Sequence, residues 1–363
     1  MDTVTGAPLV SVVIPCFNLG RFLDEAVESA LGQTFPDLEV VVVDDGSTDP
    51  DTRALLADYR RPRTRVVRSE NRGLPAARNL GIRSSRGAYV CALDADDRLE
   101  PAWLEKAVGV LQADPSLAFV SHWFRAFGDE RWDWTPQRCD LVSLLDSNTV
   151  NGAALVRREV LEAAGLFDES MREGCEDWEL WLRIVKGGGR GAILPEMLYA
   201  YRRRPDSMSR ALMEGDAYGR QYRYLLEKHG DAFREHYFEL WLRGEARIAE
   251  SRRHASDLER DCREWLEPER ARRQEEVLLL RRKVESVERE QERDAAQARL
   301  SARVAELEGA QAEQAGRVRD LEAEALRRQT RIEDLERSLS WRLMVPLRAL
   351  HRWLRGAGAG GPR

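Results

Sequence analysis

The sequence of 363 residues is poor in cysteine and in long apolar runs. Its five cysteines lie far apart, without a Cys-x-x-Cys pair, which favours a reducing compartment over a disulfide framework or a zinc site. Nowhere do 18 apolar residues run together, so no membrane-spanning helix is expected. Residues 1–8 lack both a basic and an apolar signal region, so no secretory signal is expected. These absences predict a cytoplasmic protein, or one peripheral to the inner face of a membrane.

Basic residues are in the minority, and very few of them are lysines. The 57 basic residues face 63 acidic ones, giving a formal net charge of -6. A nucleic-acid-binding protein usually carries an excess of basic residues, so no nucleic-acid partner is expected. The length suits one large domain or two to three smaller ones, with enough residues to bury a core.

Proline is missing from a long C-terminal stretch, between Pro268 and Pro346. Composition changes near residue 245, and sixteen of the thirty residues from 270 to 299 are charged. We interpret residues 246–340 as a charged coiled-coil helix, because positions from Leu300 to Leu339 repeat at 3-4 spacing. A phase slip at residues 291–299 and polar seam positions leave a single solvated helix or a partly disordered tail as alternatives. A homo-oligomer is expected, as a dimer or a trimer.

The last segment, residues 341–363, holds five arginines and no acidic residue. Its apolar residues Leu347, Leu350, Trp353 and Leu354 share one helical face. A basic amphipathic helix of this kind suits an anionic membrane surface. The alternative is a short helix that packs on the rest of the chain or on a partner.

Short β-branched runs alternate with helical patterns in the first hundred residues. Strands are predicted at residues 10–14, 39–43, 65–67 and 88–93, and helices at residues 21–31, 51–59 and 74–83. This alternation predicts an α/β fold with a Rossmann-like parallel sheet and right-handed crossovers. We expect one domain over residues 1–245, closed by a helical segment at residues 211–245.

Two of the predicted strands end in carboxylates. Asp44 and Asp45 follow the second strand, and Asp94-Ala-Asp-Asp97 follows the fourth. Ligands of open α/β sheets bind at this edge, and Mg²⁺ is commonly held by one or two carboxylates together with substrate phosphates. The pattern therefore predicts a metal-diphosphate site. Either acidic segment alone would also suit a turn or a helix cap.

An ordered series of motifs resembles the inverting glycosyltransferases of family 2, which have the GT-A nucleotide-sugar-binding fold. The series runs from residue 8 to residue 210: Val10-Ser-Val-Val-Ile-Pro-Cys-Phe-Asn18, Val43-Asp-Asp-Gly-Ser-Thr-Asp49, Asn71-Arg-Gly, Ala77-Arg-Asn-Leu-Gly81, Leu93-Asp-Ala-Asp-Asp-Arg98 and Glu176-Asp-Trp-Glu-Leu-Trp-Leu-Arg183. The segment at residues 338–348 also resembles tails of bacterial surface-polysaccharide glycosyltransferases.

The resemblance implies roles for particular residues. The implied contacts to the nucleotide or the donor sugar are Pro15, Phe17, Asp45, Asn71, Arg78 and Asp94, with Arg72 less certain. Asp96 of the DxD motif would hold Mg²⁺ or Mn²⁺ on the diphosphate. Asp177 would be the general base that deprotonates the acceptor hydroxyl. Its carboxylate would also suit the ordinary acidic first turn of a helix.

The expected function is sugar transfer, with inversion, from a nucleotide-diphosphate donor to a glycan or a lipid-linked acceptor. A UDP-sugar is the most common donor in such enzymes. The chain lacks the Gln-x-x-Arg-Trp motif of processive relatives, and it has Arg203, Arg204 and Ser207 where some relatives place a metal-binding histidine. Two alternatives are a nucleotidyltransferase and a coiled-coil scaffold with an inactive nucleotide-sugar-binding domain.

Four aromatic residues, His122, Trp123, Trp132 and Trp134, cluster between the acidic motif and Asn151. Aromatic faces can stack on sugars, which would make the cluster part of an acceptor site. Packing within the core or a hairpin is the more common role of such residues and is the interpretation favoured here.

Overall fold

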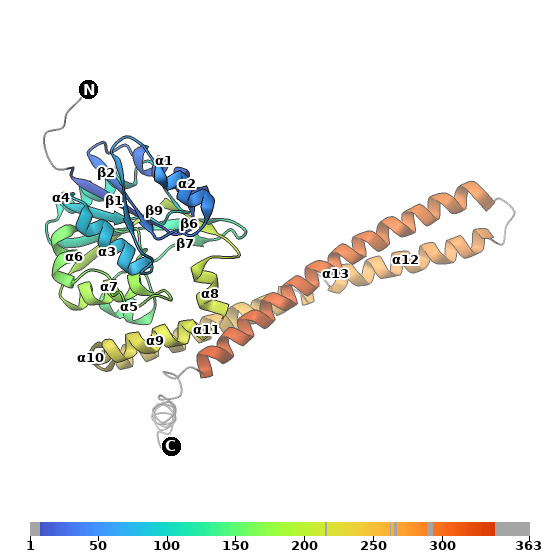
Figure 1. Ribbon diagram of the computed structural model, residues 1–363. Coiled ribbons are helices and arrows are strands. Elements are labelled where there is room, and N and C mark those ends of the chain that lie inside the picture. The colour runs from blue at the N-terminus through green and yellow to red at the C-terminus, as the bar shows by residue number, and fades with distance from the viewer. Residues whose placement is uncertain (1–7, 215, 262, 265–266, 289–292, 338–363) are drawn as a thin grey trace, which may run out of the picture. The chain divides into compact units, whose positions relative to one another are not determined.

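The computed structural model (Figure 1) describes residues 8–337 except 215, 262, 265–266 and 289–292. Contacts divide the chain into an N-terminal unit, Met1–Leu240, and a C-terminal unit, Trp241–Arg363. The predicted boundary at residue 245 falls within α11 (Tyr237–Asp261), the helix that continues across this division. The basic tail predicted at residues 341–363 lies outside the described residues.

The N-terminal unit is built on one mixed sheet, in which nine strands are described. These strands are β1 (Val10–Cys16), β2 (Leu38–Asp45), β3 (Thr64–Ser69), β4 (Tyr89–Ala92), β5 (Arg98–Leu99), β6 (Leu117–Gly128), β7 (Asp133–Trp134), β8 (Leu155–Arg157) and β9 (Arg190–Arg203). Their order is β3-β2-β1-β4-β8-β6-β9-β5, with β7 paired to β6. The first four strands are parallel, and β8 runs antiparallel to both of its neighbours.

Ten helices of this unit are described, and they connect or cover the strands. They are α1 (Gly20–Leu31), α2 (Pro50–Ala57), α3 (Leu74–Ser84), α4 (Trp103–Ala113), α5 (Leu141–Asp146), α6 (Arg158–Ala164), α7 (Glu176–Lys186), α8 (Met208–Glu214), α9 (Ala217–Lys228) and α10 (Gly230–Glu235). The four strands and three helices predicted from the first hundred residues are confirmed, with each end shifted by at most two residues. The α/β fold class is therefore confirmed.

Both faces of the parallel part of the sheet are buried, because helices cover each of them. Along β2, Val40 and Val42 enter one apolar cluster, while Val41 and Val43 enter a second cluster on the opposite face. Successive side chains of a strand point to opposite faces, so a strand buried on both sides becomes a continuous apolar run. The four cysteines that the structure describes are free thiols, three of them buried within this unit.

Helix α3 lies very close to the sheet at Gly81. A Cβ atom at this position would come within 2.2 Å of Cγ1 of Val13 and 3.0 Å of Cγ2 of Val43. Only glycine permits this approach without moving β1 or β2. The close packing fixes the position of Arg78, one turn earlier on the same helix.

Helices α8 to α10 follow the last strand, and α9 packs on α7. Tyr222 lies 5.8 Å from Trp178 between ring centroids, and Leu225 is fully buried. His229 lies 3.3 Å from the buried carboxylate of Glu179 on α7. The segment that was expected to close the domain therefore contacts the sheet through α7 as an intermediate layer.

The C-terminal unit contains two long antiparallel helices, α12 (Glu267–Glu288) and α13 (Arg293–Arg337) (Figure 1). Arg281 and Glu308 form an ion pair of 2.6 Å between them, and Val277 and Leu307 are buried. The predicted seam positions from Leu300 to Arg328 are all buried or half-buried. Assembly of several chains through this seam remains a prediction. Within the described ranges, no helix has the length and apolar character needed to cross a membrane.

Candidate active site

The acidic strand ends meet at one edge of the sheet, as predicted. The parallel register places Cys16 beside Asp44, and Val13 beside Ala92. The last residues of β1, β2 and β4 therefore point their following loops in one direction. These loops begin with Phe17 after β1 and with Asp94 after β4.

Asp45 is buried at the end of β2 and fixes a neighbouring loop. One carboxylate oxygen accepts the backbone N–H of Arg72 at 3.0 Å, and the other accepts that of Gly73 at 2.9 Å. Asn71, just before them, is exposed. Gly46 has a φ of 68° and leaves no room for a Cβ atom, which would lie 2.6 Å from the Asn71 nitrogen. Asp45, predicted to bind the nucleobase, and Asn71, predicted to lie close to the nucleotide, thus belong to one tightly packed corner.

The two residues expected to line the base pocket differ in exposure. Pro15 is buried within β1, whereas Phe17 is 41% exposed and offers an open ring surface. The next residue, Asn18, joins two loops, because its side-chain oxygen accepts the backbone N–H groups of Thr48 and Asp49. Only Phe17 of the pair presents a free apolar face at this edge.

Arg78 is the centre of a buried charge cluster. Its guanidinium is only 3% exposed, and it pairs with Asp94 at 2.7 Å and with Glu176 on the adjoining nitrogen. Its Nε is buried without a hydrogen-bond partner. Burial raises the pKa of the Glu176 carboxyl to about 7, although Arg78 opposes that rise. Arg78 therefore links Asp94, in the loop after β4, to the first turn of α7.

Asp177 lies beside this cluster, in the first turn of α7, and is half-buried. It accepts the backbone N–H of Trp178 at 2.7 Å and a side-chain N–H of Asn148 at 3.3 Å. Removal from solvent raises the pKa of Asp177, against the opposing effect of Arg78. A Cβ atom on Gly152 would lie 3.4 Å from Oδ2 of Asp177. The glycine thus keeps space open in front of this carboxylate.

The last acids of the DxD motif are both held by the end of β9. Asp96 accepts a hydrogen bond from Nε of Arg204 at 2.8 Å, and both side chains are largely buried. Burial, and then the nearby Asp94, raise the pKa of Asp96. Asp97 is buried and accepts the Tyr199 hydroxyl and the backbone N–H of Arg202, each at 2.6 Å.

We tested whether this arrangement suits a divalent cation. In the part of the chain that the structure describes, no three Asp, Glu, His or Cys side chains come together as metal ligands. All three acids of the motif already have partners: Asp94 pairs with Arg78, Asp96 with Arg204 and Asp97 with Tyr199. Asp96 is the acid that a cation could share, because Arg204 also reaches the exposed Asp206. One carboxylate with diphosphate oxygens and water is a common set for Mg²⁺. The donors therefore fit a cation shared with a diphosphate.

Most of the aromatic cluster serves packing. His122 is fully buried between Trp103 and Tyr199, at centroid distances of 4.4 and 5.2 Å, and burial lowers its pKa to about 4. Trp134 stacks on Phe124 at 4.9 Å. Trp132, which also contacts Phe124, is 41% exposed.

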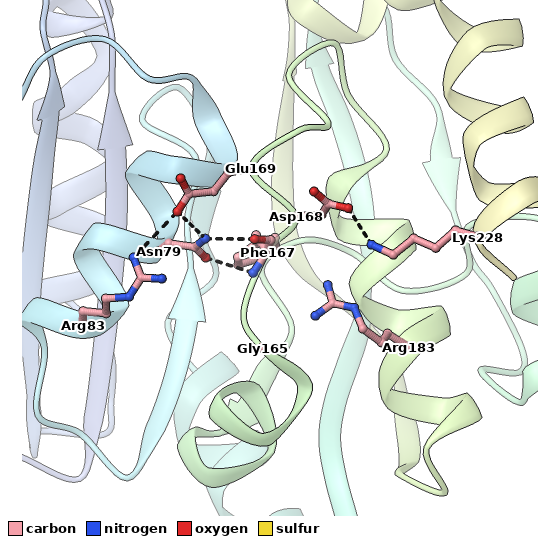
Figure 2. Close-up of a pocket in the computed structure, with 8 residues that line it drawn as sticks. All are labelled: Asn79, Arg83, Gly165, Phe167, Asp168, Glu169, Arg183 and Lys228. Carbon is pink, nitrogen blue, oxygen red and sulfur yellow. Dashed lines mark hydrogen bonds and ion pairs between the residues drawn. The ribbon is translucent and has the colours of Figure 1, made fainter.

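A pocket of about 370 Å³ lies where α3, α7 and α9 meet the loop that follows α6 (Figure 2). It is lined by Asn79, Arg83, Gly165, Phe167, Asp168, Glu169, Arg183 and Lys228. None of the predicted site residues lines it. The three cations already pair with carboxylates: Lys228 with Asp168, Arg83 with Glu169 and Arg183 with Glu179. Lys228 and Arg83 thereby join α9 and α3 to the loop after α6, and Arg183 pairs within α7, so these charges serve the packing of the domain.

The structure thus brings Asp94, Arg78 and Asp177 into one cluster and places Asp96 two residues after Asp94 on the same loop. Three neighbours have direct contacts to these residues: Glu176, Asn148 and Arg204. The sequence offered Glu176 as part of the acidic motif and Arg204 as a residue that could assist the phosphates, but it gave no role to Asn148. Glu176 stands beside Asp177 in the motif, which is a usable signal. Asn148 lies in a loop without any distinguishing pattern.

Comparison with known proteins identifies the class of this domain. Residues 11–164, which run from β1 through α6, match the model of Glycosyl transferase family 2. This part of the chain is therefore a family 2 glycosyltransferase domain, and the expected GT-A fold class is confirmed.

Curated relatives match slightly more than half of the chain. The uncharacterized glycosyltransferase EpsJ of Bacillus subtilis is 32% identical over 220 residues, which are 56% of this chain and 63% of EpsJ. The succinoglycan biosynthesis protein ExoO of Rhizobium meliloti is 35% identical over 224 residues, 56% of this chain and 64% of ExoO. The chain thus spans less than two thirds of the length of these relatives.

Solved structures show a more distant similarity. S. aureus TarS 1–349 in complex with UDP-GlcNAc aligns with a TM-score of 0.48 and 21% identity, covering 55% of this chain and 60% of that TarS chain. No argument about ligands of this chain rests on a similarity of that size.

Proposed function

We propose that this protein is a glycosyltransferase that moves a sugar from a nucleoside-diphosphate donor to a glycan or a lipid-linked acceptor. One observation carries the proposal: a single buried arginine, Arg78, joins Asp94 at the end of β4 to the first turn of α7, where Asp177 stands. A donor-binding carboxylate and a candidate base are thereby fixed relative to each other. Transfer with inversion needs both, because the base must approach the sugar from the face opposite the leaving diphosphate.

Asp177 is proposed as the general base. A base must come within about 2.6–3.2 Å of the oxygen that it deprotonates, and the space left open by Gly152 gives a hydroxyl that access. The raised pKa of Asp177 makes the carboxylate a better proton acceptor. Its place at the N-terminus of α7 keeps it anionic, since the helix dipole stabilises negative charge there.

The donor is proposed to lie along the sheet edge. The exposed ring of Phe17 suits stacking on a nucleobase, with Pro15 behind it and with Asp45 and Asn71 at the adjacent corner. Asp94 would contact the ribose or the sugar. Asp96 would hold Mg²⁺ or Mn²⁺, and a bound cation would neutralise the leaving diphosphate. A UDP-sugar is the proposed donor.

The names of the relatives support a role in polysaccharide synthesis, since ExoO is a succinoglycan biosynthesis protein. A homo-oligomer through the helices of the C-terminal unit, a cytoplasmic location and peripheral contact with a membrane remain part of the proposal. The family match makes an enzyme the better hypothesis than a scaffold with an inactive domain.

The test is hydrolysis and transfer across a panel of nucleotide sugars, with Mn²⁺, Mg²⁺ or EDTA. Asp177→Asn should lower turnover of the accepted donor by about 10²- to 10⁴-fold while leaving its affinity within a few-fold. Glu173→Gln is the matched control, because Glu173 is an exposed acid on the preceding loop that pairs with Arg220. Equal turnover in Asp177→Asn and wild type would reject Asp177 as the base. Failure of every nucleoside diphosphate to bind would favour the scaffold.

A further inference from the structure

Arg204 contacts the one acid of the DxD motif that is available to a cation. Its Nε lies 2.8 Å from Oδ2 of Asp96, with side-chain exposures of 12% and 14%. The guanidinium also lies 5.4 Å from the Phe22 ring centroid. An ion pair shielded from water in this way is much stronger than a surface pair. The negative charge of Asp96 is thus already balanced by Arg204.

The other two acids of the motif have partners that are fixed within the core. Arg78, which holds Asp94, also pairs with the buried Glu176. Asp97 is bound by Tyr199 and by a backbone N–H. Releasing Asp97 would leave a buried carboxyl group unpaired, at considerable cost. Releasing Asp94 would leave Arg78 paired with Glu176 alone, while Asp94, at 34% exposure, can turn to water.

Arg204 has a second carboxylate within reach, and this carboxylate lies at the surface. Its Nη1 donates to Asp206 at 2.6 Å, and Asp206 is 62% exposed. If Arg204 leaves Asp96, its charge keeps a partner at the surface. The contact between Arg204 and Asp96 can therefore open without leaving the guanidinium of Arg204 unpaired.

We propose that Arg204 is an internal counter-ion that competes with the divalent cation for Asp96 and, once displaced, pairs with the diphosphate of the donor. This inference rests on the proposed function. A divalent cation on Asp96 would stand against a guanidinium at hydrogen-bond distance, so like charges drive Arg204 away. A planar guanidinium fits phosphate oxygens as well as it fits a carboxylate. The exchange therefore replaces one ion pair, Arg204 with Asp96, by two: Asp96 with the divalent cation, and Arg204 with the diphosphate.

The exchange can be measured without turnover. MnCl₂ is titrated into the full-length protein and free Mn²⁺ is followed by electron paramagnetic resonance. UDP, GDP and dTDP are then titrated calorimetrically in EDTA and in MnCl₂. The variants are Arg204→Met and Arg204→Lys. Arg203→Met is the matched control, because the adjacent Arg203 pairs with Glu130 at 3.3 Å and does not contact Asp96. Thermal unfolding checks that each variant is folded.

Arg204→Met should bind Mn²⁺ about tenfold more tightly than wild type, since an ionic hydrogen bond no longer competes. It should lose about tenfold in nucleotide affinity in saturating MnCl₂, where Arg204 of the wild type is displaced onto the diphosphate. Arg204→Lys keeps the charge without the planar guanidinium, so its Mn²⁺ and nucleotide affinities should lie between those of wild type and Arg204→Met. If Arg204→Met does not fold, Arg204→Lys provides the test. Arg203→Met should match wild type within about twofold.

Equal Mn²⁺ affinity in wild type and the Arg204 variants would overturn the inference, as would an equal change in Arg203→Met. If none of the three nucleotides binds wild type, the proposed function fails, and the pairing with diphosphate fails with it. The Mn²⁺ titration alone still decides whether Arg204 competes for Asp96.

Discussion

Replacing Arg78 by methionine tests the central charge cluster, because among the described residues Arg78 is the cation that pairs with the buried Glu176. Breaking a buried ion pair on one side costs about 3 to 5 kcal/mol, mostly because a charge is left uncompensated. Asp94, at 34% exposure, can turn to water, whereas Glu176, at 6%, cannot. We therefore expect the loss at Glu176 to dominate, and the Tm to fall by about 10 °C.

The loss of stability in Arg78→Met should become smaller as the pH falls. Burial already raises the pKa of Glu176 to about 7 from an ordinary value of 4.5, and removing Arg78 should raise it further. The folded variant then binds a proton more tightly than the unfolded chain does, so acidification stabilises the folded state. Thermal unfolding of Arg78→Met and wild type from pH 8 to pH 5 should show the difference shrinking as the pH falls.

Two further variants make the experiment decisive. Arg83→Met lies on the same helix, but Arg83 is 58% exposed and 3.7 Å from its partner, so it should cost less than about 0.5 kcal/mol. Adding Glu176→Met to Arg78→Met should restore most of the stability, because an apolar pair of similar volume has no charge to solvate. A Tm for Arg78→Met within 2 °C of wild type, or a double variant less stable than the single one, would refute the reasoning.

Two other predictions follow from contacts described above. Asn148→Ala removes an N–H that stabilises the Asp177 carboxylate, so the pKa of Asp177 should rise. The acid limb of the pH profile of kcat/KM should then move up by about 0.5 to 1 pH unit. An acid limb that stays in place or moves down would contradict this prediction. Leu307→Asp buries a charge between α12 and α13 and should destabilise their pairing by at least about 2 kcal/mol, seen as earlier loss of helical circular dichroism. Leu326→Asp, at a position 66% exposed, is its control and should melt like wild type.

Much of the fold was predictable because its signals are local. The β-branched runs of β1 and β2 are buried on both faces, and this forces a continuous apolar pattern that is visible in the sequence. The acidic strand ends were predictable for the same reason, since parallel strands bring their carboxyl ends to one edge. The seam in α12 and α13 was also visible, but a 3-4 spacing does not say whether its partner belongs to the same chain.

The pairing of charges was not predictable, because it joins distant segments. Arg78 meets Asp94 after 16 residues and Glu176 after 98 residues, while Arg204 meets Asp96 after 108. No local period records such contacts. They depend on how closely α3 approaches the sheet and on where β9 ends, and both are set by packing across the whole domain.

The hydrogen bonds of Asp45 affect how a substitution there should be understood. Its two oxygens hold the backbone of residues 72 and 73, so the same carboxylate that is proposed to bind the base also orders the loop carrying Asn71. In Asp45→Ala, the loop around residues 71–73 would lose these hydrogen bonds. Ordering that loop would then reduce the free energy of nucleotide binding. A weakened nucleotide affinity in that variant would be the sum of a lost contact and a lost preorganisation, and would overstate the strength of the contact.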